Sequence, residues 1–159
     1  MADDFAGTRA LVEAAIRTLG VEPSVALAKE GAGQASWSLQ RGSAAILISL
    51  ASRDSGHGGK VAVYLRVISP VMTLPPPEKR EAFFRHLLEL NAQGLANAAF
   101  GVVGERVVAV AERPTEDMQG EEVTQMVRHL AAVADTYDDR LVKAFGGELA
   151  SGVKSGSKA

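Results

Sequence analysis

The chain of 159 residues has no cysteine, which excludes a disulfide framework, a cysteine zinc site and a thiol nucleophile. Aromatic residues make up only 5%, and there are three histidines. Lys and Arg number 17 against 19 Asp and Glu, so the general basic charge of a nucleic-acid binder is missing. The longest strongly apolar stretch, residues 44–51, is far shorter than the roughly 20 residues that cross a bilayer. We therefore predict a protein that binds neither nucleic acid nor membrane.

The chain does contain enough hydrophobic residues for the core of one packed domain. The hydrophobic fraction is 47%, and the length fits a single unit. The first five residues, Met-Ala-Asp-Asp-Phe, lack the basic and apolar regions of a secretory signal, so we expect a cytoplasmic protein. The last residues are mostly Ser, Gly and Lys, and this composition is typical of a disordered terminus. We predict one α+β domain over residues 1–147 and a disordered tail over residues 148–159.

The first half reads as a helix followed by three strands. Apolar residues recur every three or four positions over residues 3–19, and Gly20 ends this predicted helix. Alternating or continuous apolar runs predict strands at 34–40, 44–50 and 61–68. The glycine-rich residues 52–59 between the last two fit a mobile hairpin loop.

The second half reads as helix, two strands and helix. Three consecutive prolines within residues 70–77 predict an irregular linker. Helices follow at 78–91 and 120–145, with strands at 98–103 and 106–112 between them. Gly104-Glu105 fits a tight type II′ turn joining these two strands. The whole order predicts a two-layer α+β domain with an antiparallel five-stranded sheet.

Three segments carry a family resemblance. They are Leu87-Leu88-Glu89-Leu90-Asn91, the hairpin from Phe100 to Val108, and the final-helix segment from Ala131 to Asp138. Together they resemble the YbjN family, often labelled bacterial sensory transduction regulators, and the element order resembles the type III secretion chaperone-like fold. The resemblance covers roughly residues 3–145. It implies a small, often dimeric, protein-binding protein and no catalytic residue.

The reactive side chains form no recognised catalytic or metal-binding motif. The loop from Asp54 to Lys60 fails as a phosphate loop, because Asp54 and Val61 stand where Gly and Ser or Thr are required. His86 and His129 lie on different predicted helices, with no His-Glu-x-x-His pair. Three acidic residues, Asp135, Asp138 and Asp139, fit a solvated helix face better than a cation site. We predict no catalytic, cofactor-binding or metal-binding residue, and no enzyme activity.

The helix at 78–91 has more apolar residues than one buried face requires. Its surplus predicts a homodimer or partner interface, and the alternative is a helix sunk deeper into its own core. Trp37 is either a partner anchor, since Trp is enriched at binding hot spots, or a core residue. The predicted interface residues are Phe83, Phe84, Leu87, Leu88 and Trp37.

These observations favour a non-enzymatic protein-binding module that holds a segment of a partner protein on its sheet and helix surfaces. The alternative is a small-ligand sensor with a pocket between the sheet and the Pro-rich linker. The two differ in what should stabilise the protein, a partner segment or a metabolite.

Overall fold

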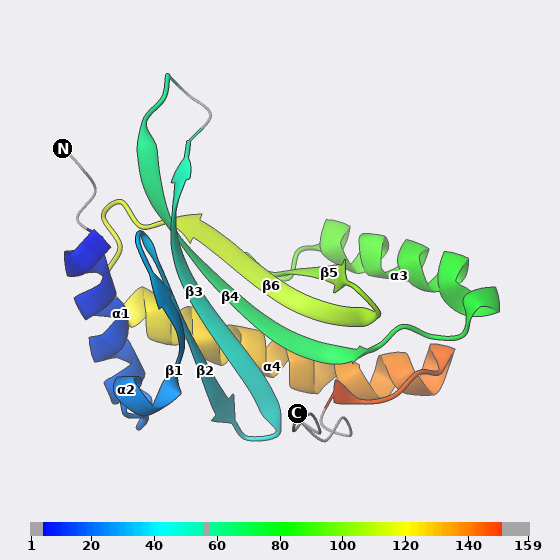
Figure 1. The fold of residues 1–159 in the computed structure, drawn as a ribbon. Helices are drawn as coiled ribbons and strands as arrows, with labels where there is room; N and C mark the ends of the chain where they lie inside the picture. The colour runs from blue at the N-terminus through cyan, green and yellow to red at the C-terminus, as the bar shows by residue number, and fades with distance from the viewer. Residues whose placement is uncertain (1–4, 56–57, 151–159) are drawn as a thin grey trace.

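A computed structural model describes residues 5–55 and 58–150 of the chain. Six antiparallel strands form one sheet in the order β1-β2-β3-β4-β6-β5. Helices α1 (Phe5–Thr18) and α4 (Gly120–Phe145) pack on one face of this sheet, and α3 (Arg80–Gln93) lies along the β5 edge (Figure 1). The predicted two-layer α+β architecture with an antiparallel sheet is confirmed, whereas the predicted strand number of five is wrong.

The strands alternate between a buried face and a less buried face. Their bounds are β1 Leu27–Gly31, β2 Gln34–Arg41, β3 Ala44–Asp54, β4 Val61–Thr73, β5 Ala99–Val103 and β6 Arg106–Pro114. The side chains that face α1 and α4 form the core, in which Ile48, Leu65 and Val67 are fully buried against helix residues such as Leu130. Burying each such aliphatic side chain contributes about 1.5–3 kcal/mol, so this face holds the two layers together.

The strand that the sequence did not reveal is β1. Its residues, Leu-Ala-Lys-Glu-Gly, show no clean alternation, and all but the first are exposed. β1 pairs only with β2, with a bulge between Leu27 and Lys29. It is preceded by a short helix, α2 (Pro23–Ala26). An edge strand of this kind depends on its neighbour for its hydrogen bonds, so its own sequence carries little signal.

The expected linker over residues 70–77 begins later than predicted, because β4 continues to Thr73. Pro70 stands opposite Val108 of β6, beside a bulge between Pro70 and Met72. The pairing of β4 with β3 has already ended at Ile68, so the amide that proline lacks is not needed on that side. A 3-10 turn at Pro77–Lys79 then leads into α3, which starts at Arg80, two residues after the predicted start of this helix.

Two turns depend on glycine. Gly104 has φ +60° in the two-residue loop between Val103 and Arg106, as the predicted type II′ turn requires. Gly147 has φ +90°, and a Cβ there would lie 2.7 Å from the carbonyl oxygen of Thr73. This close approach follows the end of α4 and brings the chain back to β4.

The segment after α4 is more ordered than predicted at its start. The amide of Thr73 donates to the carbonyl of Glu148, and Leu149 forms an antiparallel bridge with Met72. The predicted disordered tail over residues 148–159 is therefore wrong for its first two residues, because these hydrogen bonds fix them. Residues 151–159 lie outside the described part of the chain.

Candidate functional site

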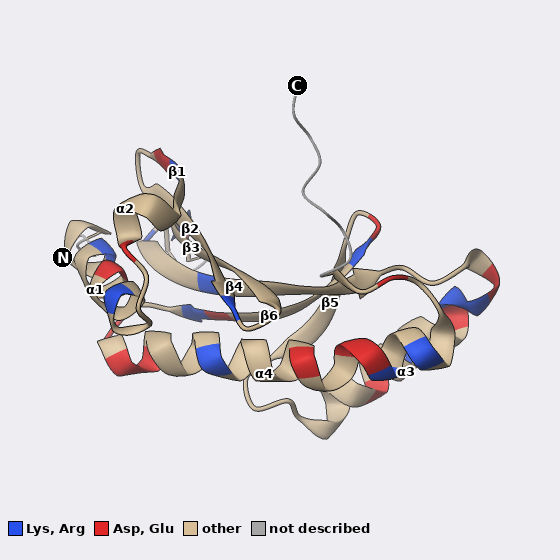
Figure 2. Ribbon diagram, turned by 90° about the horizontal axis from the view of Figure 1, so that it is seen from below, with Lys and Arg blue, Asp and Glu red and all other residues tan. Residues whose placement is uncertain are grey.

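The sheet has one face that its long helices leave uncovered. Figure 2 shows α4 running along one side of the strands, with no comparable helix on the other side. We call this second side the open face. The register of the strands assigns to it Lys29, Gly31, Gln34, Ser36, Ser38, Gln40, Ala45, Leu47, Ser49, Ala51, Arg53, Ala62, Tyr64, Arg66, Ile68, Pro70, Thr73, Ala99, Gly101, Val103, Arg106, Val108, Val110, Glu112 and Pro114.

The open face has an apolar part over β3, β4 and β6. Leu47 pairs with Ile68, and Ile68 pairs with Val110, so these three side chains form one row across the sheet. Pro70 and Val108 pair in the next row, where Pro70 is partly exposed and Val108 is buried. We call these five residues the apolar strip. The row of three is only partly buried although it lies in the middle of the sheet, so it offers apolar surface that another molecule could cover.

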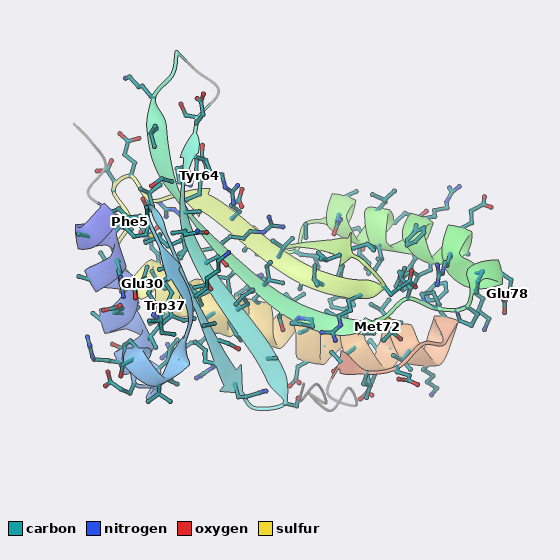
Figure 3. All side chains as sticks on the ribbon, viewed as in Figure 1. Phe5, Glu30, Trp37, Tyr64, Met72 and Glu78 are labelled. Carbon is teal, nitrogen blue, oxygen red and sulfur yellow. The ribbon has the colours of Figure 1, made fainter. Side chains whose placement is uncertain are left out.

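Beside the apolar strip lies a cluster of charged and aromatic side chains. Arg53 donates two hydrogen bonds to the carboxylate of Glu112, at 3.1 and 3.0 Å. The Nε atom of Arg66 lies 3.8 Å from the same carboxylate. The guanidinium of Arg53 lies 5.5 Å from the ring centroid of Tyr64, where the β3–β4 hairpin leaves the body of the sheet (Figure 3). Two guanidinium groups thus share one carboxylate, and the cluster carries a net positive charge.

A second uncovered apolar surface lies at the other end of the molecule, on α3 and the β5–β6 hairpin. Its side chains are Phe84, Leu88, Val102 and Val103, with relative exposures of 37%, 67%, 44% and 57%. Val102 pairs with Val107 and Val103 with Arg106, so these two side chains lie on opposite faces at the end of β5. We call them the α3–β5 patch. Large apolar side chains exposed to this extent on neighbouring elements are typical of a surface that another protein covers.

Asn91 sets the position of α3 against β5. Its side-chain amide donates to the carbonyl of Phe100 at 3.1 Å and accepts from the amide of Phe100 at 2.7 Å. These are the outward-facing backbone groups of the edge strand, so Asn91 occupies the place of a neighbouring strand. Leu88 and Phe84 precede Asn91 by about one and two helical turns, so they share its side of α3.

The predicted interface residues divide into two groups. Phe83 and Leu87 are buried, and the Phe83 ring packs edge-to-face on Phe145 of α4 with centroids 5.2 Å apart. Phe84 and Leu88 are exposed, as an interface requires. Trp37 is fully buried among the side chains near α1 (Figure 3), so the core alternative holds and its assignment as a partner contact is wrong. The sequence showed a wide apolar face but could not tell which part of it faces the core.

The histidines and clustered acids have structural contacts. His129 Nε2 lies 2.6 Å from the carbonyl of Leu95 and ties the α3–β5 loop to α4, while His86 packs on Phe145. Asp135 accepts a hydrogen bond from Ser43, and burial raises the pKa of Asp138 above its usual value. No group of three or more metal-binding side chains occurs within residues 5–55 and 58–150. Within the same residues no helix is long and apolar enough to cross a membrane.

One depression beside the start of the Pro-rich linker is small. Met72, Thr73, Arg106 and Ala150 line it, and it encloses about 180 Å³ including its open mouth. Ligand pockets usually enclose about 300–1,000 Å³. The geometry therefore gives less support to the small-ligand alternative than to binding of a larger partner on the two uncovered surfaces.

Comparison with known proteins gives a family for the chain. A family model described as "T3SS (YopN, CesT) and YbjN peptide-binding chaperone 1" matches residues 7–152. The resemblance inferred from the sequence segments is thus confirmed. No curated protein sequence matches the chain.

Solved structures share the fold at low sequence identity. The ExsC–ExsE complex matches with a TM-score of 0.60 and 18% identity over 87% of this chain and 96% of that chain. The HopA1–SchA chaperone–effector complex has a TM-score of 0.51 and 14% identity, covering 83% of this chain and 93% of the other. The heterodimeric ExoU–SpcU complex from the type III secretion system of Pseudomonas aeruginosa has a TM-score of 0.52 and 14% identity, covering 84% and 97%.

Proposed function

We propose how this chain, which belongs to the family of T3SS and YbjN peptide-binding chaperones, holds its client: a segment of the partner protein lies across the open face of the sheet. The observation that carries this proposal is the apolar strip, whose central row stays partly exposed in the middle of the sheet. The chain acts by binding, without catalysis. The similar structures include a chaperone–effector complex, which is consistent with a protein segment as the client. We propose that this action takes place in the cytoplasm.

The face of the sheet is a better docking surface than its edges. At the β5 edge, Asn91 already uses the amide and carbonyl of Phe100. At the other edge, β1 is short and bulged and carries Lys29 and Glu30, which are features that oppose strand addition. The backbone groups of the inner strands pair with one another. A client is therefore held mainly through its side chains, by covering the apolar strip.

The spacing of the open face suits a regular client segment. Successive side chains on one face of a strand are about 6.6 Å apart, and neighbouring strands are about 4.8 Å apart. An extended client presents side chains at the first spacing, and a helix presents residues i and i+4 at about 6 Å. Either conformation can place one apolar side chain over Ile68 and a second over Pro70, which is partly exposed in the next row.

Selection from a random peptide library displayed on phage tests this proposal. Purified wild-type protein should enrich peptides rich in apolar residues, and Ile68→Glu should abolish the enrichment because it places a charge in the middle of the apolar strip. Val61→Glu is the matched control, since Val61 is exposed near the end of the β3–β4 hairpin. Circular dichroism must show that both variants fold. Failure of the wild-type protein to enrich any peptide would refute the proposal, as would equal enrichment by the two variants.

The α3–β5 patch is proposed as a homodimer interface. Two copies related by a two-fold axis would cover Phe84, Leu88, Val102 and Val103 of each other. Light scattering should give about twice the monomer mass of 16.7 kDa. Leu88→Glu should yield a folded monomer, whereas Leu87→Glu should unfold the domain, because only Leu87 is buried. A monomeric wild-type protein at every concentration would rule out the dimer.

A further inference from the structure

The charged side chains of the open face are mostly of one sign. The register places Lys29, Arg53, Arg66 and Arg106 on this face and, among the acidic residues of the described strands, Glu112 alone. The whole chain has the opposite balance, with a formal net charge of -2. The other charged strand residues point elsewhere. On the helix-covered side, for example, Arg113 donates a hydrogen bond to Glu122 of α4, and Glu30 forms an ion pair with Arg9 of α1.

Folding alone does not account for this concentration of positive charge. Arg53 already binds both oxygens of Glu112, so Arg66 is left with the longer contact of 3.8 Å to that carboxylate. The Nε atom of Arg66 is buried and donates no hydrogen bond within the described residues. A guanidinium has five N–H donors arranged in a plane that matches a carboxylate. Arg66 therefore has donors to spare, next to another cation.

We infer that the client segment is acidic and amphipathic, with apolar side chains over the apolar strip and Asp or Glu side chains over Arg66 and the neighbouring basic residues. The inference rests on the proposed function and adds the chemistry of the client. Arg66 and Ile68 are neighbours on the same face of β4, about 6.6 Å apart along the strand. A client therefore presents a carboxylate one step away from an apolar side chain. Removing apolar surface from water would also strengthen the nearby ion pairs.

An RNA strand fits the same surface less well. Single-stranded RNA is usually bound by several aromatic side chains on which bases stack. The register gives the open face one aromatic residue, Tyr64, and the guanidinium of Arg53 already lies against its ring. The apolar strip offers aliphatic side chains, which suit a peptide. RNA binding thus becomes an outcome that the experiment must be able to reveal.

Three fluorescein-labelled 16-residue peptides test the charge preference. They share one amphipathic pattern of Leu and Ile and carry Glu, Gln or Lys at every polar position. Fluorescence anisotropy should show at least tenfold tighter binding of the Glu peptide than of the Gln peptide, and the weakest binding for the Lys peptide. Raising the salt concentration from about 0.05 to 0.5 M should remove most of this difference, because salt screens exposed charges.

Two variants locate the effect on the open face. Arg66→Gln and Arg106→Gln should each weaken binding of the Glu peptide by about three- to tenfold and leave binding of the Gln peptide unchanged. Arg85→Gln is the matched control on α3, where the side chain is 82% exposed. Arg106 is exposed, so its variant keeps the test valid even if Arg66→Gln destabilises the sheet.

The outcomes separate this inference from the proposed function. If the library selection enriches neutral or basic peptides, or if the three labelled peptides bind equally, the inference is wrong while the proposed binding of peptides still holds. An effect of Arg85→Gln as large as that of Arg66→Gln and Arg106→Gln would also overturn it. Tighter binding of a labelled oligo-uridine than of the Glu peptide would overturn the inference and identify RNA as the ligand of the open face. If no peptide is enriched or bound, both the inference and the proposed function fail.

Discussion

Replacing Asn91 by Ala should loosen the β5 edge of the sheet. The substitution removes both hydrogen bonds to the backbone of Phe100, which measure 3.1 and 2.7 Å. Each is worth about 1 kcal/mol, and Ala regains about 0.5 kcal/mol through its better helix propensity. The expected loss in the free energy of unfolding is thus about 1.5 kcal/mol. For a chain of this length it lowers the melting temperature by about 3–6 °C.

Thermal and urea denaturation followed by circular dichroism measure this loss. Gln93→Ala is the control, since Gln93 lies in the last turn of the same helix and is exposed. Hydrogen exchange of the Phe100 amide should become faster in Asn91→Ala and stay unchanged in Gln93→Ala, because only the first loses its acceptor. Equal stability of the two variants, with equal exchange at Phe100, would refute the role assigned to Asn91.

Two further substitutions test other local interactions. Gly147→Ala should destabilise the protein more than Gly20→Ala, as measured by urea denaturation. Both glycines have a positive φ, which costs an L-residue about 1–2 kcal/mol, but only at position 147 does the new Cβ meet the carbonyl of Thr73, at 2.7 Å, so equal losses would argue against this packing. Hydrogen bonding to the Gln119 amide, and then to Arg113, lowers the pKa of Glu122 at the start of α4. A carboxyl whose pKa is lower in the folded state stabilises the fold above its ordinary pKa, and this contribution is lost as the pH falls through the folded value. Melting temperatures measured from pH 7 to pH 3 should therefore fall less steeply for Glu122→Gln than for the wild type, and parallel curves would contradict the prediction.

Periodicity predicted most of the fold because most elements bury one regular face. The strands at 34–40 and 44–50 and the long final helix were found in this way, since their apolar residues repeat at the period of the element. β1 was missed because an exposed edge strand needs no such repeat. The continuation of β4 through Pro70 was missed because a proline is tolerated only where pairing with one neighbouring strand has ended. Only the tertiary structure shows that β3 and β4 pair no further than Leu47 and Ile68.

The candidate sites could be predicted from the sequence to different degrees. The excess of apolar residues on α3 was visible, but only the packing of Phe83 on Phe145 decides which of them remain outside. Trp37 could not be assigned because a single large residue on a strand suits a core and a docking surface equally well. The basic open face was hidden in a balanced composition. Its residues come from four strands, and only the register between those strands brings Lys29, Arg53, Arg66 and Arg106 onto one side.

The bridge between Leu149 and Met72 sets a limit on how far the chain can be shortened. These last described residues occupy the position beside β4 that β3 has left, and the carbonyl of Glu148 accepts the amide of Thr73. Truncation after Gly147 would leave that amide without its acceptor and would expose a new stretch of strand edge. A fusion partner or affinity tag should accordingly be attached beyond Ala150, where it leaves this short piece of sheet intact.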